Sequence, residues 1–314
     1  MNQLVITVTL NPALDKTVTV NGLEVGGLNR VDDIRIDAGG KGINVAKVLK
    51  GFHENVIATG FIGGHNGSLI LQGLEREEIR HSFTVTAAET RMNLKVVDSS
   101  AQVTTEINER GGVVSREERT LFNKALEKQL EEASILVLGG SVPPGIEHGE
   151  YALLIKAAKS KGVKTILDAD GDALRYGLIA CPDVIKPNIH ELEQLLGTTL
   201  NTVEEIVLAA RELIYQGIEW VIVSMGGEGS IAVSKDKALR ARPFRITPES
   251  TVGAGDSMVA AIASSLMRGR GLEETLRWAT AAGSVTASKP GTQVCRPEEV
   301  EERLQDVGIT RIEA

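Results

Sequence analysis

The sequence predicts an α/β protein in which helices flank a mostly parallel central sheet and a small β-sheet is inserted. Buried, β-branched runs alternate with amphipathic stretches along most of the chain, as in parallel strands joined by helical crossovers. Two separated pairs of short, alternating strands interrupt this rhythm, at about residues 16–37 and 89–108. No repeat, low-complexity tract or linker divides the 314 residues, so we expect a single domain.

Composition and charge exclude several classes of protein. The formal net charge of −8 argues against nucleic acid or an anionic membrane as the main partner. No apolar run approaches the length of a membrane span, and the first residues lack the basic segment of a leader peptide. Cys181 and Cys295 are not in CxxC spacing and the five histidines are scattered, so we expect neither a disulfide framework nor a structural metal site. These features favour a cytoplasmic protein.

The chain begins with a buried strand over residues 4–10, which a proline ends. Asp15 comes shortly after this strand, and ligands of open α/β sheets bind outside the carboxyl ends of the strands. We therefore expect Asp15 to accept hydrogen bonds from the hydroxyl groups of a sugar. The alternative is an aspartate that only forms a turn.

A glycine-rich stretch, residues 39–42, opens an amphipathic helix that runs to residue 49. Its three glycines let the backbone approach a polar ligand closely, and Asn44 lies on the first turn of the helix. Lys41 stands among the glycines, where a lysine suits a phosphate group as a point charge. The alternative is a flexible loop with a solvated lysine.

The inserted strands surround a strand at 55–61 and a helix at 68–75. They are predicted at 17–20, 31–37, 92–97 and 102–107. Two such pairs suggest a small sheet that covers one end of the main sheet. Arg91 and Asn93 lie at the start of the second pair. An arginine can bind a phosphate through two hydrogen bonds, although a solvated arginine on a strand fits the pattern equally well.

From Ser115 onward the alternation of helices and strands resumes, beginning with the pattern of a capping box at 115–118. Helices are predicted at 115–132, 151–160, near 172, and at 203–216, 272–288 and 297–305. Strands are predicted at 135–138, 164–168, 184–185, 220–223, 230–234 and 239–244. The last two strands have the pattern of an antiparallel hairpin at the edge of the sheet.

Polar residues follow three of these strands. Ser141, Lys186 and Ser224 each come just after one of them. Gly226 and Gly229 then form a turn that is suited to lie beside a nucleotide. Because the carboxyl ends of parallel strands share one edge of a sheet, these residues favour a common ligand site.

Asn188 and Glu191 lie three residues apart at a predicted helix start, so both side chains can face the same way. An amide and a carboxylate in this arrangement suit Mg²⁺ bound through its water molecules. The same spacing is also typical of a helix cap, and the sequence alone does not separate the two roles.

The segment Thr251-Val252-Gly253-Ala254-Gly255-Asp256-Ser257 runs into an apolar helix over 258–267. Free N–H groups and the positive end of the dipole make a helix start a site for anions. Asp256 adds a carboxylate at the same point, and the combination suits phosphoryl transfer to a hydroxyl. The alternative is an ordinary N-cap aspartate. Five polar residues are thus expected just after strands: Asp15, Ser141, Lys186, Ser224 and Asp256.

The chain lacks a GxxxxGK[ST] loop, a GxGxxG after its first strand, and the HRD and DFG sequences of protein kinases. Along essentially its whole length it resembles the ribokinase-like sugar kinases of the phosphofructokinase B group. Six motifs carry the resemblance: 10–15 (LNPALD), 39–46 (GGKGINVA), 90–93 (TRMN), 140–145 (GSVPPG), 186–191 (KPNIHE) and 251–257 (TVGAGDS). Within this group the chain is most similar to 1-phosphofructokinases, and next to tagatose-6-phosphate kinases.

The resemblance implies a three-layer ribokinase-like fold with a small β-sheet lid, and a homodimer formed through the lid sheets. It implies transfer of the γ-phosphoryl of ATP to a primary hydroxyl of a ketohexose phosphate. Fructose 1-phosphate is the expected acceptor, tagatose 6-phosphate is the alternative, and 6-phosphofructokinase activity is a weaker one. ATP and Mg²⁺ are the expected cofactors, with a monovalent cation as a further candidate. A sugar-phosphate sensor without turnover and a nucleoside kinase are the competing functions.

The resemblance also implies a role for each candidate residue. Asp256 is the base, and the backbone of Gly253, Ala254 and Gly255 is the anion hole. The sugar phosphate is held by Asp15, Gly39, Gly40, Lys41, Asn44, Arg91, Asn93 and Ser141. ATP is bound by Lys186, Asn188, Ser224, Gly226, Gly229 and Thr251. Mg²⁺ is organised by Asn188 and Glu191.

Overall fold

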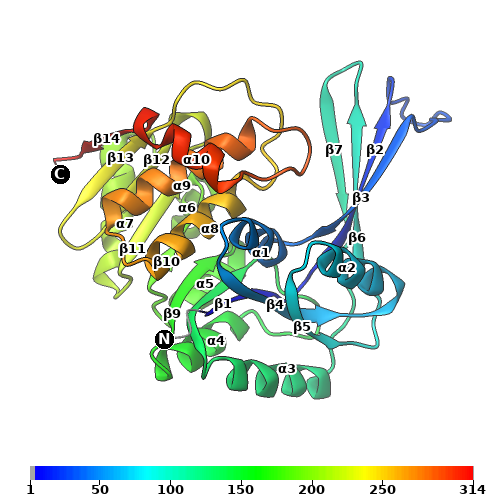
Figure 1. Cartoon of the computed structure of the whole chain (residues 1–314), viewed down its shortest axis with the longest axis horizontal. Helices are drawn as coiled ribbons and strands as arrows, with labels where there is room; N and C mark the ends of the chain where they lie inside the picture. Colours follow the sequence, from blue (N-terminus) through cyan, green and yellow to red (C-terminus); the bar gives the residue numbers. More distant parts are fainter. Residues whose placement is uncertain (1–3, 314) are drawn as a thin grey trace.

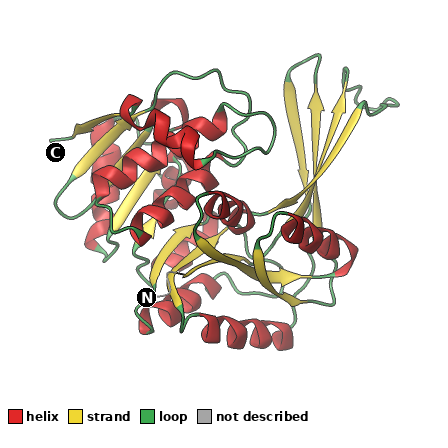
Figure 2. Cartoon of the chain, viewed as in Figure 1, coloured by secondary structure: helices red, strands yellow, loops and turns green. Residues whose placement is uncertain are grey.

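A ten-stranded sheet forms the middle layer of the computed structural model, which describes residues 4–313 (Figures 1 and 2). Its parallel strands run in the order β5 (Arg80–Val85), β4 (Asn55–Ile62), β1 (Leu4–Thr9), β8 (Ala133–Gly139), β9 (Lys164–Asp168), β10 (Val184–Ile185) and β11 (Trp220–Ser224). The antiparallel strands β12 (Ser230–Val233), β13 (Ala238–Arg242) and β14 (Gly308–Arg311) extend the sheet beyond β11.

Helices cover both faces of this sheet. One face packs against α1 (Lys41–Gly51), α2 (Gly64–Arg76), α8 (Ala254–Met267), α9 (Leu272–Ala287) and α10 (Pro297–Arg303). The other face packs against α3 (Arg116–Gln129), α4 (Glu150–Ser160), α5 (Gly171–Leu178), α6 (Ile189–Leu196) and α7 (Val203–Tyr215). Side chains alternate along a strand, so Val5 of β1 joins the first core while Leu4 and Ile6 join the second. The expected three-layer arrangement is confirmed.

A separate four-stranded sheet projects from this body (Figure 1). Its order is β3 (Asp33–Gly39), β2 (Ala13–Val20), β6 (Arg91–Asp98) and β7 (Val103–Asn108). The register places Asp15 of β2 between Asp37 of β3 and Asn93 of β6, so these residues share one face. The opposite face is mostly apolar, although Lys16 and Thr105 also lie on it, and Ile36 of β3 and Ile107 of β7 on that face are exposed. The two inserted strand pairs of the sequence therefore form one sheet, with bounds a few residues from those expected.

Two expected positions are wrong. Asp15 does not follow the end of a strand, because the chain re-enters a strand at Ala13 and Asp15 is the third residue of β2. Asp256 does not follow a strand either, because residues 243–253 separate β13 from α8. Helix α8 also begins four residues earlier than expected, since Gly253 adopts a left-handed conformation (φ 77°) from which the helix starts at Ala254.

Two strands were not anticipated from the sequence. β5 carries charged and polar residues and lies at one edge of the ten-stranded sheet, and β14 is a short strand at the other edge. Both therefore lack the buried apolar run that identifies the central strands. Within residues 4–313, no helix has the length and apolar character needed to cross a membrane.

Candidate active site

The start of α1 lies against the end of β1, and its glycines make this contact sterically possible. A Cβ atom on Gly42 would lie 2.6 Å from the carbonyl oxygen of Val8, and Gly40 has a φ of 121°. This approach places Lys41 as the first residue of α1, with its ammonium ion-paired rather than free. The alternative of a flexible loop with a solvated lysine is therefore wrong.

Two lysines share one carboxylate in the interior of the site. Lys41 Nζ lies 3.2 Å and Lys186 Nζ 3.3 Å from the same oxygen, Oδ1 of Asp168. Glu191 Oε1 lies 3.7 Å from Lys41 Nζ on another side. Burial favours the protonated form of Asp168, but the two lysines outweigh it and lower the pKa of this carboxyl. Burial likewise opposes the charge of Lys41, but Asp168, Glu191 and Asp256 raise its pKa above the ordinary value.

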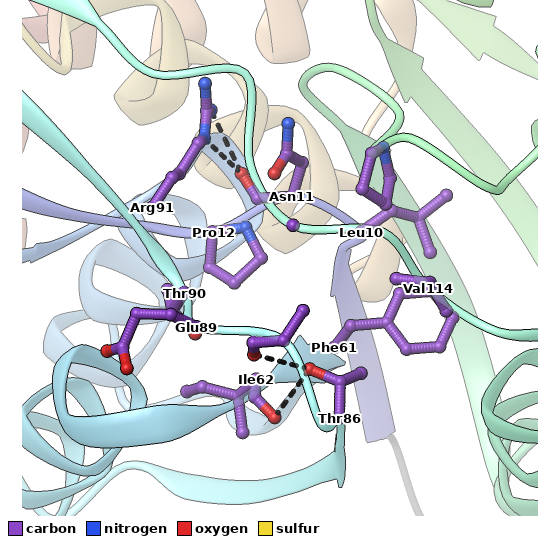
Figure 3. A pocket seen from close by; sticks show the side chains of 13 residues that line it. Leu10, Asn11, Pro12, Phe61, Ile62, Thr86, Glu89, Thr90, Arg91 and Val114 are labelled. Atoms are coloured by element: carbon purple, nitrogen blue, oxygen red, sulfur yellow. Dashed lines mark hydrogen bonds between the residues drawn. The ribbon is translucent and has the colours of Figure 1, made fainter.

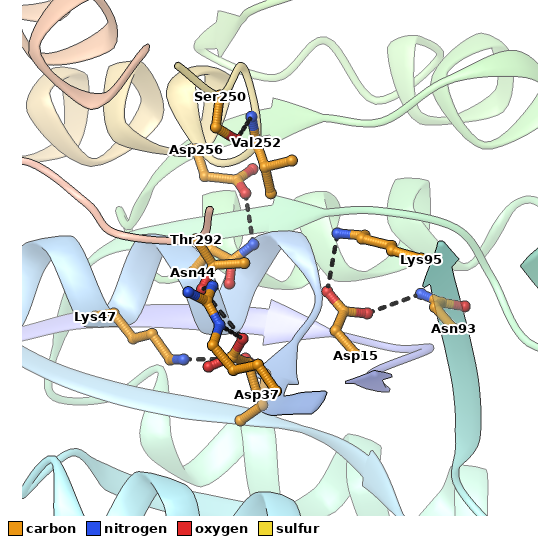
Figure 4. A network of polar contacts seen from close by, with 12 residues as sticks. Asp15, Asp37, Asn44, Lys47, Asn93, Lys95, Ser250, Val252, Asp256 and Thr292 are labelled. Atoms are coloured by element: carbon orange, nitrogen blue, oxygen red, sulfur yellow. Dashed lines mark hydrogen bonds and ion pairs between the residues drawn. The ribbon is translucent and has the colours of Figure 1, made fainter. Parts of the chain in front are cut away.

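Asp256 lies in the first turn of α8 and is buried, with 8% of its surface exposed. Its Oδ2 accepts a hydrogen bond from Asn44 Nδ2 of α1 at 2.7 Å (Figure 4). Burial raises the pKa of Asp256 to about 6, with help from the charge of Asp168 and against the hydrogen bond of Asn44. A carboxylate in this range is ionised at neutral pH and still able to accept a proton.

No side chain caps the start of α8, because the N-cap residue is Gly253. Asp256 stands three residues further on, so the alternative of an ordinary N-cap aspartate is wrong. A Cβ on Gly255 would lie 3.5 Å from Lys186 Nζ, which places this ammonium directly beside the helix start. The uncapped N–H groups and Lys186 together make this point electropositive.

A narrow cleft runs from the polar face of the small sheet to the start of α8. It is lined by Asp15, Asp37, Ala38, Asn44, Lys47, Val252, Gly253, Thr292 and Val294. Asp15 accepts hydrogen bonds there from Asn93 Nδ2 at 3.1 Å and from Lys95 Nζ at 3.4 Å (Figure 4). Gly39 is required beside it, because a Cβ would lie 2.6 Å from Asp15 Cγ.

Arg91 binds main-chain carbonyls. Its Nε and Nη2 donate to the carbonyl of Asn11 at 3.2 and 3.0 Å (Figure 3), and its Nη1 donates to that of Glu109 at 2.9 Å. The alternative of a solvated arginine is therefore wrong. Asn11 Nδ2 donates to Ser141 Oγ at 3.1 Å, which links the turns after β1 and β8. Arg91 and Ser141 thus meet through Asn11, and Asn11 and Arg91 line a second, small cavity.

Asn188 and Glu191 form a reciprocal capping box at the start of α6. Asn188 Oδ1 accepts from the main-chain N–H of Glu191, and Glu191 Oε2 accepts from that of Asn188, both at 2.8 Å. The helix cap that the sequence left open is therefore present. Glu191 Oε1 remains directed towards Lys41, so capping does not use the whole carboxylate.

The remaining candidates lie around the end of β11, except Thr251. The main-chain N–H of Ser224 donates to the carbonyl of Pro187 at 3.0 Å, which joins this strand to the Lys186 segment. Gly226 has a φ of 55° and begins a short 3₁₀ turn over Gly226–Glu228. A Cβ on Gly229 would lie 2.0 Å from the carbonyl oxygen of Ala241, so packing against β13 requires this glycine. Thr251 is exposed near the start of α8.

Two polar residues of this region were missed from the sequence. Asp168 is the last residue of β9, so the strand-end rule that selected Ser141 could have found it. Lys95 is two residues after Asn93 on β6 and therefore shares its face. Asp15, the partner of both Asn93 and Lys95, lies 78 positions before Asn93 in the chain. Only the pairing of β2 with β6 brings these residues together.

Comparison with known proteins assigns the chain to a family. Residues 8–299 match the model of the pfkB family of carbohydrate kinases. The chain belongs to this family. It is 36% identical over 312 residues to tagatose-6-phosphate kinase of Staphylococcus epidermidis, which covers 98% of this chain and 100% of that protein. It is also 36% identical over 311 residues to 1-phosphofructokinase of Bacillus subtilis, with the same coverage.

Solved structures support the same assignment. The crystal structure of phosphofructokinase-2 from Escherichia coli in complex with potassium matches with a TM-score of 0.90 and 29% identity, over 98% of this chain and 99% of that one. This pfkB kinase therefore has the ribokinase-like fold that its motifs implied. Three of the six motifs contribute residues to the cleft: 10–15 (Asp15), 39–46 (Asn44) and 251–257 (Val252 and Gly253).

Proposed function

We propose that this pfkB kinase transfers the γ-phosphoryl of ATP to a primary hydroxyl of a ketohexose phosphate, with fructose 1-phosphate as the preferred acceptor. The observation that carries the proposal is Asp256, a buried carboxylate with a pKa of about 6 at an uncapped helix start. It accepts a hydrogen bond from the Asn44 amide, and Asn44 lines the same cleft as Asp15. This arrangement supplies a base, an anion hole and polar contacts for a sugar within one site.

The sugar lies in the cleft in this proposal, with its hydroxyl groups on Asp15, Asn93 and Asn44. Asn93 Oδ1 is buried and has no hydrogen-bond partner within residues 4–313, so a sugar hydroxyl would satisfy it. Gly39 and Gly40 let the backbone approach the sugar, and Lys41 attracts its phosphate. Arg91 and Ser141 support the phosphate end, and Arg91 does so by holding Asn11 as well as by its charge.

The transfer step needs one acceptor oxygen, one base and one site for the developing charge. The acceptor oxygen forms a bond to the γ-phosphorus, the bond from that phosphorus to the oxygen of ADP breaks, and the acceptor proton passes to Asp256. The transition state is loose, so orienting the hydroxyl contributes as much as removing its proton. The Gly253–Gly255 backbone and Lys186 stabilise the negative charge of the transferred group.

The nucleotide occupies the edge formed by Lys186, Ser224, Gly226, Gly229 and Thr251 in this proposal. Residues 4–313 contain no cluster of three acidic, histidine or cysteine ligands, so an all-protein metal cage is not expected there. Oε1 of Glu191, which faces Lys41 and is not used by the capping box, fits Mg²⁺ held through water, and the main-chain N–H of Asn188 orients this carboxylate through its Oε2. Mg²⁺ supplies charge neutralisation to the phosphates of ATP. A monovalent cation remains a candidate, since the related phosphofructokinase-2 is described in complex with potassium.

The exposed apolar face of the small sheet supports a homodimer. Ile34, Ile36, Val103 and Ile107 are each at least half exposed, and the register places them on the face opposite Asp15. A face of this kind favours contact with another protein surface. We propose that two copies pair through these sheets, which would also hold each sheet as a lid over its cleft.

Tagatose 6-phosphate is the alternative acceptor. The chain is as similar to tagatose-6-phosphate kinase as to 1-phosphofructokinase, at 36% identity in both cases. The two substrates can place a phosphate and a free primary hydroxyl in similar positions, and they differ in the configuration of one ring hydroxyl. A few hydrogen bonds are enough to separate such substrates.

The experiment that tests the proposal is ADP release by the purified protein with Mg²⁺ and ATP. Fructose 1-phosphate, tagatose 6-phosphate and fructose 6-phosphate are compared side by side. We expect the highest kcat/KM with fructose 1-phosphate. A preference for tagatose 6-phosphate would keep the site and overturn the substrate assignment. Absence of turnover with all three would favour a sensor or a nucleoside kinase instead.

A further inference from the structure

Among the charged residues of the site that have no role in the transfer step, Asp168 is the most deeply buried. It is the last residue of β9, and 3% of its side chain is exposed. Its Oδ1 contacts Lys41 Nζ at 3.2 Å and Lys186 Nζ at 3.3 Å. The lysines come from two other elements, the start of α1 and the segment after β10.

The two lysines come from different segments of the site. Lys41 belongs to the glycine-rich segment that borders the sugar cleft, one helical turn from Asn44. Lys186 lies beside Gly255, at the start of α8. Because both ammonium groups contact the same oxygen atom, they lie close together and would repel each other without Asp168. The carboxylate is therefore the element that permits two cations at this point.

The backbone fixes the carboxylate. The carbonyl of Asp168 accepts a hydrogen bond from the N–H of Gly140 at 3.1 Å, and the N–H of Lys186 donates to the carbonyl of Leu167 at 3.3 Å. Strands β8, β9 and β10 thus hold Asp168 and Lys186 in a fixed relation. Lys186 is as buried as Asp168, with 4% of its side chain exposed, so water does not replace their contact.

We propose that Asp168 is a positioning residue that holds Lys41 and Lys186 as a pair of cations beside the start of α8, one towards the sugar and one towards the nucleotide. This inference rests on the proposed function, because it assumes that phosphate groups meet at this point. Asp168 acts through the lysines and does not contact the reacting atoms. Its role differs from that of Glu191, whose Oε1 we assign to water-mediated contact with Mg²⁺.

Binding of ATP to the Asp168→Asn variant tests the proposal without any turnover. Loss of a negative charge alone would strengthen the binding of an anion. Loss of a positioning residue releases Lys186 and weakens binding, and we expect the Kd for ATP, measured by calorimetry with Mg²⁺, to rise at least threefold. An unchanged or lower Kd would overturn the proposal. If no sugar phosphate is turned over, the proposed function fails, but this binding result still decides the role of Asp168.

Coupling to the lysines gives a second test, which a purely structural role would not satisfy. In the wild-type protein, we expect Asp168→Asn to lower kcat at least tenfold. In a protein that already carries Lys41→Met and Lys186→Met, the same substitution should lower kcat less than twofold. A full effect in that background would show that Asp168 acts independently of the lysines and would overturn the proposal. The Mg²⁺ concentration at half-maximal rate should stay within twofold in Asp168→Asn and rise in Glu191→Gln. A shift of that concentration in Asp168→Asn would also contradict it.

Asp183→Asn is the matched control. Asp183 Oδ2 accepts hydrogen bonds from the N–H and the hydroxyl of Thr165, near the opposite end of β9. We expect this variant to lower thermal stability without changing the Kd for ATP. If Asp168→Asn does not fold, the pair Lys41→Met and Lys186→Met replaces it. The fold loss of kcat in the double variant should be less than one third of the product of the two single-variant losses. A double-variant loss within twofold of that product would overturn the proposal.

Discussion

Asn44→Ala should move the acid limb of the pH–rate profile to higher pH. In the wild-type protein, Asn44 donates a 2.7 Å hydrogen bond to Asp256, and this bond favours the ionised carboxylate. A hydrogen bond to a charged group contributes about 1.5 kcal/mol or more. Since 1.36 kcal/mol corresponds to one pKa unit, loss of the bond should shift the acid limb upward by about one pH unit.

The direction of the pH dependence follows from the role of Asp256 as a base. Activity requires the ionised form, so activity is present above the pKa of Asp256 and is lost as the pH falls through about 6. At pH 6 about half of the wild-type carboxylate is ionised, and a shift of one pH unit leaves about one tenth. We therefore expect Asn44→Ala to lose about fivefold more kcat/KM at pH 6 than at pH 9.

The assay is kcat/KM for the best sugar phosphate, measured by ADP release between pH 5 and pH 9. Asn123→Ala serves as the control, because Asn123 Nδ2 makes a similar 3.2 Å contact with the buried Glu150, away from the cleft. The control should keep the wild-type acid limb. An unshifted acid limb in Asn44→Ala, with activity reduced equally at every pH, would refute the coupling between Asn44 and the base.

Three further predictions concern the base, the glycine-rich segment and the small sheet. Asp256→Asn should bind sugar phosphate with a near wild-type Kd and lose about 10²-fold or more in kcat, and a wild-type kcat would refute its role as base. Gly42→Ala should lower the free energy of unfolding by about 1–3 kcal/mol in urea titrations, because its Cβ would lie 2.6 Å from the Val8 carbonyl oxygen. Gly149→Ala is its control, because a Cβ at Gly149 would have no neighbouring atom within 4 Å, and it should show no comparable loss of unfolding free energy. Ile34→Asp should convert a dimer to a monomer in sedimentation experiments, and a monomeric wild-type protein would contradict the proposed pairing.

Much of the architecture could be predicted because the central strands have buried apolar runs with clear ends. β9 and β10 match their expected bounds, since β9 begins at Lys164 and ends at Asp168 and β10 lies between Asp183 and Lys186. The edge strands β5 and β14 could not be predicted in this way, since an edge strand is partly solvated and carries polar residues.

The site was predictable to the extent that its residues lie in local motifs. Lys41, Asn188 and Asp256 lie in glycine-rich or capping sequences that predict a helix start. The hydrogen bond between Asn44 and Asp256 joins residues 212 positions apart, and no local pattern reports it. Local spacing also could not show that the donors of Arg91 are used by main-chain carbonyls, because those carbonyls come from other turns.

Analysis of the product by ³¹P NMR tests the central claim most directly. The wild-type protein is incubated with ATP, Mg²⁺ and fructose 1-phosphate. The account predicts ADP and a ketohexose 1,6-bisphosphate in equal amounts, so the sugar product should give two phosphomonoester signals. With Asp256→Asn, no second phosphomonoester signal should appear. Release of ADP with inorganic phosphate but no bisphosphate, or no reaction in the presence of all three ketohexose phosphates, would contradict it.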